Sequence, residues 1–133
     1  MTQLSIIIPA LNEEQVIART LRALKRLRAR GVEVIVVDGG SGDNTPVIAR
    51  ELSDRVRVAP RGRATQMNAG AAVASGEALL FLHADSQLPY QADDLVLSAL
   101  KCSRWGRFDV RLSGSHHVFR VIENLMNLRS RLS

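Results

Sequence analysis

The sequence is poor in cysteine and in aromatic residues. Its one cysteine, Cys102, cannot form an internal disulfide, and no spaced histidines or second cysteine indicate a zinc site. We interpret Cys102 as a structural thiol in a reducing compartment. Aromatic residues make up 4% of the chain, which leaves few side chains to stack on bases and disfavours a nucleic-acid-binding protein.

Long hydrophobic runs are also missing. No apolar segment approaches the roughly 20 residues that cross a bilayer. The opening MTQLSIIIPALNEE lacks the basic start and the long apolar stretch of a secretory signal, and we therefore expect a cytoplasmic location. With 46% hydrophobic and 23% charged residues, the 133-residue chain has the composition of one globular domain with a single core.

Positive charge is concentrated near the C-terminus. The net charge is +5, yet residues 1–100 hold equal numbers of basic and acidic side chains, so the excess lies in residues 101–133. Within this region HVFRVIENLMNLRSRL has helical apolar spacing, which predicts either a core helix or a basic amphipathic helix on a membrane surface. We expect this region to support self-association or peripheral contact with the inner face of the membrane.

Short apolar segments alternate with segments of helical spacing. Five β-branched or apolar stretches predict strands at residues 4–8, 32–37, 55–59, 78–83 and 108–113. The first helix between them is opened by Asn12, with Gln15 completing a capping box, and is closed by Gly31; the second begins with Pro46. This alternation predicts an α/β fold, a three-layer α/β/α sandwich around a mostly parallel sheet.

Three predicted strands end in polar sequences. Ile8 leads into PALNE, Val37 into DGGSGD and Leu82 into HAD. In a parallel sheet these strand ends share one edge, which is where such sheets bind ligands. Two familiar nucleotide motifs are absent there: no lysine follows a glycine as in a P-loop, and the first strand ends without a glycine.

The order of these pieces is more specific than any one of them. SIIIPALNEE, VIVVDGGSGDNT and GRATQMNAGAAVASGEALLFLHADS, in this order, resemble the inverting family 2 glycosyltransferases, whose catalytic domain has the GT-A fold for nucleotide-diphospho-sugars. The resemblance covers about residues 4–90, and WGRFDVRLSG more loosely. The pair GRATQMNAGA and FLHADS is most similar to a bacterial subgroup connected with arsenosugar biosynthesis.

The resemblance implies a divalent-cation site at the HAD sequence. In the family a short acidic motif, commonly Asp-x-Asp, ends the fourth strand and holds the cation against the donor diphosphate. His83 stands at the first acidic position, so Asp85 is carried over as the metal ligand and Mn²⁺ or Mg²⁺ as the ion. In a strand both side chains face one side, so His83 either joins the ligands or forms a hydrogen bond nearby. The alternative for Asp85 is a turn or cap residue.

The resemblance also implies a set of residues that bind the sugar nucleotide. The first-strand motif implies a nucleoside pocket, Asp38 a contact to the base or ribose, and Arg63 a contact to phosphate. Ordinary helix starts and βα turns contain the same residue types, and these alternatives stay open. The substrate-binding residues expected on this basis are Pro9, Ala10, Asn12, Glu13, Asp38, Arg63, Asn68, His83 and Ala84.

Catalytic domains of this family are usually well over 133 residues long. We therefore expect an apparently truncated GT-A domain, in which residues 1–100 bind the donor nucleotide and residues 101–133 begin the acceptor side. In the family an aspartate beyond the metal motif removes the acceptor's proton, and no residue here matches it. Asp109 lies between Arg107 and Arg111 and is better explained by an ion pair. The chain alone is expected to bind a donor without transferring sugar.

Three functions are compatible with these observations. The leading one is a metal-assisted, inverting glycosyltransferase, or its donor-binding part, with a nucleotide-diphosphate sugar as its ligand. The second is a non-catalytic nucleotide-sugar-binding module, since the base is missing. The third, a basic membrane-surface or nucleic-acid-binding protein, has only the positive charge of the chain in its favour.

Overall fold

The computed structural model of the chain describes residues 3–88, 91–102, 109–111 and 118–120. Its elements in chain order are β1 (Leu4–Ala10), α1 (Ile17–Ala23), α2 (Lys25–Ala29), β2 (Glu33–Asp38), α3 (Thr45–Leu52), β3 (Arg55–Val58), α4 (Arg63–Val73), β4 (Ala78–Phe81), α5 (Ala92–Cys102), β5 (Asp109–Arg111) and β6 (Val118–Arg120). No helix in the described part is both long enough and apolar enough to cross a membrane.

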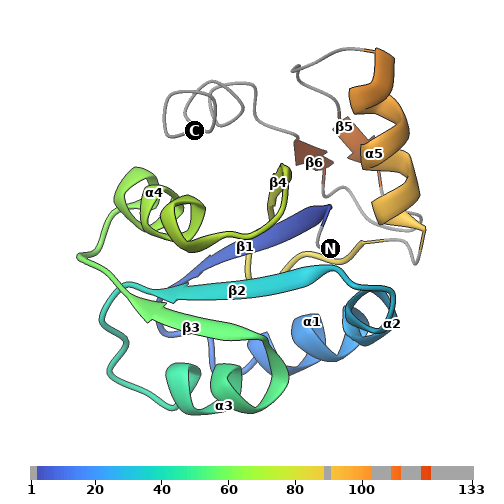
Figure 1. Cartoon of the computed structure of the whole chain (residues 1–133). Helices are drawn as coiled ribbons and strands as arrows, with labels where there is room; N and C mark the ends of the chain where they lie inside the picture. Colours follow the sequence, from blue (N-terminus) through green and yellow to red (C-terminus); the bar gives the residue numbers. More distant parts are fainter. Residues whose placement is uncertain (1–2, 89–90, 103–108, 112–117, 121–133) are drawn as a thin grey trace.

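The strands form one sheet in the order β3-β2-β1-β4-β6-β5 (Figure 1). β3, β2, β1 and β4 run parallel, whereas β6 pairs antiparallel with β4 and β5 antiparallel with β6. The register sets Ala10 beside Asp38, so β1 and β2 end level with each other. The predicted mostly parallel sheet is therefore confirmed.

Helices cover both faces of the sheet (Figure 1). Because successive strand side chains point to opposite faces, Ile6 and Ile8 pack in one core cluster with α1, α3 and α5, and Ile7 packs with α4 in another. Strands β1 and β2 are almost completely buried, which explains their nearly continuous apolar sequences. The predicted three-layer α/β/α sandwich is confirmed.

The first helical region begins differently from its prediction. α1 starts after Val16 without a side-chain cap, and a break at Leu24 separates it from α2. The predicted capping box is wrong, because Asn12 has a left-handed φ of 53° and its Oδ1 accepts a hydrogen bond from Gly42 N instead. The predicted end is confirmed, since Gly31 follows α2 with a φ of +96°, which glycine adopts without strain.

Boundaries in the second half of the chain also differ from prediction. The strand predicted at residues 78–83 ends at Phe81, and the residues after it form a turn in which Ser86 N donates to His83 O. The strand predicted at residues 108–113 is confirmed as β5 over Asp109–Arg111. The helix predicted from Val118 is wrong over Val118–Arg120, which form β6, and its remaining residues lie outside the described part.

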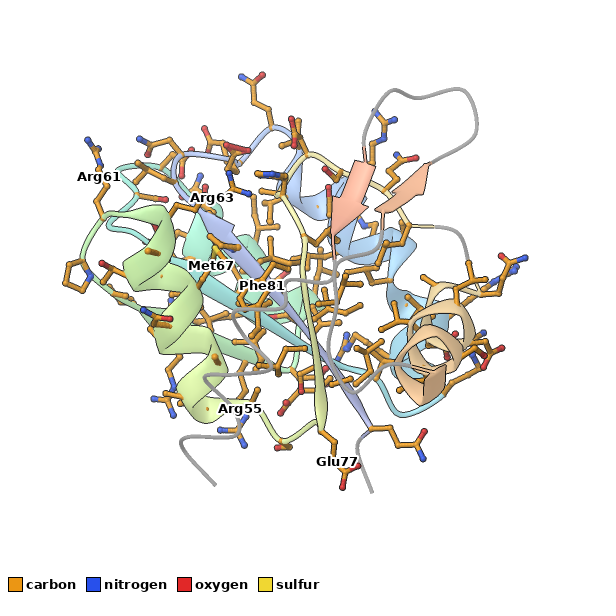
Figure 2. All side chains as sticks on the ribbon, turned by 90° about the horizontal axis from the view of Figure 1, so that it is seen from above. Arg55, Arg61, Arg63, Met67, Glu77 and Phe81 are labelled. Atoms are coloured by element: carbon orange, nitrogen blue, oxygen red, sulfur yellow. The ribbon has the colours of Figure 1, made fainter. Side chains whose placement is uncertain are left out.

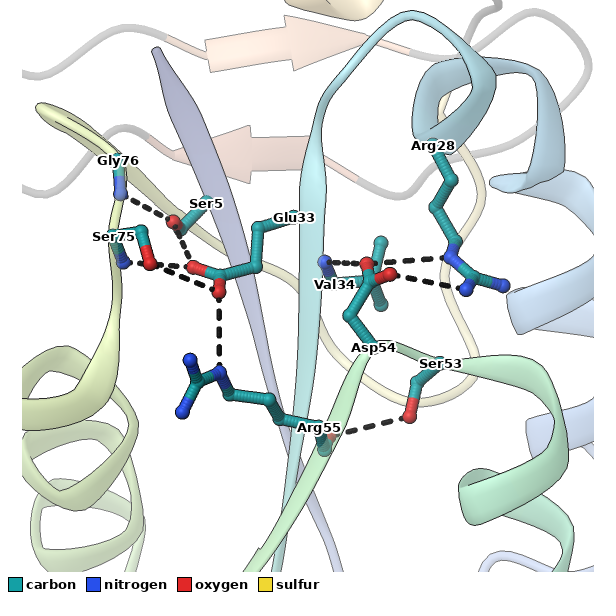
Figure 3. Close-up of polar contacts among 9 residues, drawn as sticks. All are labelled: Ser5, Arg28, Glu33, Val34, Ser53, Asp54, Arg55, Ser75 and Gly76. Carbon is teal, nitrogen blue, oxygen red and sulfur yellow. Dashed lines mark hydrogen bonds and ion pairs between the residues drawn. The ribbon is translucent and has the colours of Figure 1, made fainter. Parts of the chain in front are cut away.

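The amino end of the sheet carries a polar network that is satisfied within the fold (Figure 3). Glu33, the first residue of β2, accepts hydrogen bonds from Ser5 Oγ at 2.7 Å and from Ser75 N at 2.8 Å. It also pairs with Arg55 Nε at 3.3 Å. Gly76 N donates to Ser5 Oγ at 2.9 Å and extends the network to the start of β4. We interpret this network as stabilising the fold, because the partly buried carboxylate of Glu33 is satisfied by these partners.

Candidate functional site

A cleft of about 320 Å³ opens at the carboxyl end of β1, beside the start of α4. Its lining consists of Pro9, Ala10, Leu11, Glu13, Arg61, Gly62, Arg63, Gln66 and His83. Figure 2 shows Arg61 and Arg63 at one end of the sheet, and Arg55 and Glu77 at the other. The cleft therefore lies at the edge where the sequence predicted a ligand, and it brings together the predicted site residues Pro9, Ala10, Glu13, Arg63 and His83.

The turns after β1 and β2 are joined by hydrogen bonds in both directions. Asn12 N donates to Ser41 Oγ, and Gly42 N donates to Asn12 Oδ1, both at 2.8 Å. Next to this pair, Glu13 N donates to Thr45 Oγ1 at 2.8 Å. Asn12 is exposed and does not line the cleft, so its observed contribution is to fix the turn that places Glu13 there.

Asp38 is the internal acceptor of the glycine-rich turn after β2. It is 2% exposed. Its Oδ2 accepts hydrogen bonds from Gly40 N at 3.0 Å and Ser41 N at 2.8 Å, and its Oδ1 accepts from Ser41 Oγ at 2.5 Å. A carboxylate offers about four lone-pair positions, so most of this acceptor capacity is used inside the loop. Asp38 does not line the cleft, and its contact with a base or ribose stays a prediction.

Arg63 and His83 contact each other in the cleft. Arg63 Nη2 lies 3.1 Å from His83 Nε2. A guanidinium carries donors only, so in this arrangement Nε2 accepts the hydrogen bond and the ring proton lies on Nδ1. Both residues are exposed. The structure thus shows a hydrogen bond between His83 and Arg63, and a role of His83 as a metal ligand stays a prediction.

The turn that carries His83 and Asp85 is anchored to α1. Ala84 is 5% exposed, and its carbonyl oxygen accepts a hydrogen bond from Thr20 Oγ1 at 2.5 Å. His83 and Asp85 are exposed, whereas Ala84 and Ser86 between and after them are buried. Both polar side chains therefore face the surface, although this segment is a turn and not the predicted strand. Ala84 contributes its backbone to the anchor and does not line the cleft.

Asp85 lies outside the cleft lining but acts on Glu13 within it. The pKa of Glu13 is raised, first by desolvation on burial and then by the negative charges of Asp85 and Asp43. A divalent cation near two such carboxylates would favour their charged forms. Mg²⁺ and similar ions often use one or two carboxylates together with water and phosphate oxygens. Among the described residues no three His, Cys, Asp or Glu side chains form a metal-binding group. Glu13 and Asp85 interact electrostatically, so these two acids are the residues available to hold a cation in that way, and a metal site here stays a prediction.

Sequence reasoning missed several of the lining residues, of which Gln66 and Arg61 are the most informative. Gln66 is a buried polar side chain, 5% exposed, and helical spacing alone does not distinguish it from a surface glutamine. Arg61 stands in a loop beside Gly62, where a cationic side chain is ordinarily solvated. The predicted Asn68 lies on the exposed side of α4 and does not line the cleft.

The chain matches the model of Glycosyl transferase family 2 over residues 5–103. It belongs to this family. It is 40% identical over 99 residues to the PGL/p-HBAD biosynthesis glycosyltransferase of Mycobacterium tuberculosis, with 69% of this chain and 38% of that relative covered. It is 32% identical over 98 residues to the probable glycosyltransferase YdaM of Bacillus subtilis, and this match covers 65% of this chain and 23% of that relative. This family 2 chain thus spans well under half the length of these relatives.

Solved structures share the fold of this family 2 chain. The mannosyltransferase PcManGT from Pyrobaculum calidifontis, in complex with GDP-Man and Mn²⁺, superposes with a TM-score of 0.77 at 21% identity, covering 98% of this chain and 46% of that one. Glucosyl-3-phosphoglycerate synthase from Mycobacterium tuberculosis, in complex with Mn²⁺, UDP and glucosyl-3-phosphoglycerate, superposes with a TM-score of 0.64 at 24% identity. This match covers 74% of this chain and 39% of that one. The predicted GT-A type of fold is confirmed.

Proposed function

We propose that this family 2 chain is the nucleotide-binding part of a glycosyltransferase whose donor is a nucleotide-diphosphate sugar. The observation that carries the proposal is the cleft, where Arg61 and Arg63 stand beside the carboxyl end of β1. Guanidinium groups pair well with phosphate oxygens. Because the chain spans 38% of its mycobacterial relative, transfer by the whole protein, inversion at the sugar and the acceptor are all part of the proposal.

The proposed complex assigns a role to each predicted residue. The diphosphate contacts Arg63, and the nucleoside lies along the first-strand turn. Pro9 and Ala10 at the end of β1 and Asn12 and Glu13 in the turn after it belong to this part of the proposed site. Contacts of the ligand with Asp38, Asn68 and Ala84, which do not line the cleft, stay predictions. Relatives in fold that hold GDP-Man or UDP support a ligand of this class.

We place a divalent cation, Mn²⁺ or Mg²⁺, at Asp85, with Glu13 as the neighbouring acid. The raised pKa of Glu13, caused by burial first and then by Asp85 and Asp43, supports a position for positive charge there. The structures of both fold relatives named above are complexes that contain Mn²⁺ as well as a nucleotide ligand. When bound, the cation would stabilise the charge that develops on the leaving diphosphate.

Several narrower points stay predictions. A non-catalytic nucleotide-sugar-binding module is the alternative function, since no residue in the sequence matches the family's catalytic base. Self-association and peripheral membrane contact were assigned to residues 101–133, whose side chains lie outside the described part. The cytoplasmic location and the subgroup connected with arsenosugar biosynthesis also remain to be tested.

Calorimetric titration of the 133-residue chain with UDP and GDP, with and without Mn²⁺, tests the proposal. We expect saturable binding that is stronger with Mn²⁺. Asp85→Ala should remove the Mn²⁺-dependent gain, because it deletes the proposed ligand while leaving the core intact. Asp94→Ala is the matched control, since Asp94 is an exposed acid on α5. Absence of nucleoside diphosphate binding would refute the function, and an unchanged Asp85→Ala variant would refute the metal assignment.

A further inference from the structure

Gln66 is a buried polar side chain that connects α4 to the ends of two central strands. Its Nε2 donates hydrogen bonds to Ala10 O at 3.1 Å and to Val37 O at 3.0 Å. Ala10 is the last residue of β1, and Val37 is the penultimate residue of β2. Because a glutamine amide has two N–H donors, both are used to hold the start of α4 against the carboxyl edge of the sheet.

The same side chain holds the backbone of Gly62, the residue before α4. Gly62 N donates to Gln66 Oε1 at 3.2 Å, and Gln66 N donates to Gly62 O at 2.8 Å. Gly62 has a φ of +147°, which side-chain-bearing residues rarely adopt. Its chain neighbours are Arg61 and Arg63, and both line the cleft. The two cationic residues thus flank a glycine whose N–H is held by the Gln66 side chain and whose carbonyl accepts the first backbone hydrogen bond of α4, from Gln66 N.

The turn after β2 leaves room for this arrangement. A Cβ atom added to Gly39 would lie 2.8 to 3.0 Å from the amide atoms of Gln66. The φ of Gly39 is not in the left-handed region, so glycine here provides space and is not required by the backbone conformation. A side chain at Gly39 would push the Gln66 amide away from its three hydrogen-bond partners.

We propose that Gln66 is a positioning residue that holds Arg61 and Arg63 in place to bind the diphosphate of the donor. The inference rests on the proposed function, which assigns the cleft to a nucleotide-diphosphate sugar. Gln66 acts through the arginines and through Gly62. Gly39 supports the same role, because its lack of a side chain leaves space for the Gln66 amide to reach its hydrogen-bond partners.

Binding of pyrophosphate with Mn²⁺, measured by calorimetry on the full chain, tests this role. Gln66→Met keeps the length of the side chain and removes its hydrogen bonds, and we expect it to weaken pyrophosphate binding by about tenfold or more. Gly39→Ala should weaken binding in the same way, whereas Gly42→Ala is the control, because nothing lies within 4 Å of a Cβ at Gly42. Circular dichroism is the control that checks whether each variant is folded under the conditions of the titration.

A second pair of variants separates positioning from general stability. In a Gln66→Ala background, Gly39→Ala should cause no further loss of pyrophosphate affinity, because the side chain that it displaces is already gone. Additive losses, or an unchanged affinity in folded Gln66→Met, would overturn the role of Gln66 while leaving the proposed function in place. If the parent chain bound neither pyrophosphate nor a nucleoside diphosphate, the proposed function would fail, and this inference with it.

Discussion

Thr20 Oγ1 donates a hydrogen bond to the carbonyl oxygen of Ala84 at 2.5 Å, although the two residues lie 64 positions apart in the sequence. Both residues are buried. The contact joins α1 to the turn that presents His83 and Asp85 at the surface. A helix that does not line the cleft therefore helps to set the place of Asp85, proposed to hold the cation, and of His83, which contacts Arg63.

Thr20→Val is expected to destabilise the chain by about 1 to 3 kcal/mol, because it leaves the buried Ala84 carbonyl without this donor. The free energy of unfolding in urea measures the effect. Thr20→Ser is the control: it keeps the hydroxyl, loses one methyl group and should cost about 1 kcal/mol or less. A Thr20→Val variant as stable as the parent would contradict the anchoring role.

Asp38→Ala should lower the free energy of unfolding by about 2 kcal/mol, because the amides of Gly40 and Ser41 lose a charged acceptor. The free energy of unfolding of Asp38→Asn, which retains one acceptor oxygen, should lie between those of Asp38→Ala and the parent.

Titration of Asp38→Ala with UDP and with pyrophosphate tests the predicted base or ribose contact. A loss confined to UDP supports the contact, and equal losses assign Asp38 to the loop alone.

Gly70→Ala tests how closely α4 approaches the sheet. A Cβ at Gly70 would lie 2.5 Å from Ile7 Cγ2 and 3.0 Å from Val37 Cγ2. Alanine improves helix propensity by about 1 kcal/mol, but overpacking of this kind costs about 1 to 3 kcal/mol, so we expect a net loss of stability and a lower Tm. Gly42→Ala should leave Tm nearly unchanged, and a Gly70→Ala variant with a raised Tm would show that the helix can shift without strain.

The ion pair between Arg30 and Asp93 predicts a pH-dependent contribution to stability. Arg30 Nε and Nη2 donate to Asp93 at 3.0 and 2.8 Å, and the pKa of Asp93 is lowered, chiefly by this hydrogen bond. Because the folded pKa lies below the unfolded one, the contribution is present above the unfolded pKa, about 3.9, and is lost as pH falls through the folded pKa.

Asp93→Asn should therefore lower the free energy of unfolding by about 1 kcal/mol at pH 7, since Arg30 is partly exposed. The difference from the parent should shrink toward pH 2. Urea unfolding at both pH values measures it, with Asp94→Asn as the neighbouring exposed control. A difference that is the same at pH 2 and pH 7 would mean that Asp93 stabilises α5 by some means other than its charge.

The elements of the fold were largely readable from local sequence. Buried parallel strands need continuous apolar residues on both faces, so residues 4–8 and 32–37 correspond closely to β1 and β2. Pro46 lies in the first turn of α3, and Gly31 follows α2 with positive φ. These preferences belong to a residue and its immediate neighbours, and the polar sequences after the strands located the correct edge of the sheet for the same reason.

Only the tertiary structure decided the partners of the polar side chains at that edge. Asn12 looked like a helix cap, yet it bonds to Gly42, 30 positions away. Gln66 looked like any helical glutamine, yet its amide reaches carbonyls 29 and 56 positions away. A polar side chain bonds to whichever partner the packed elements bring within about 3 Å. That choice depends on how helices and strands meet in space, and so the network of the site formed only when the sheet and its helices came together.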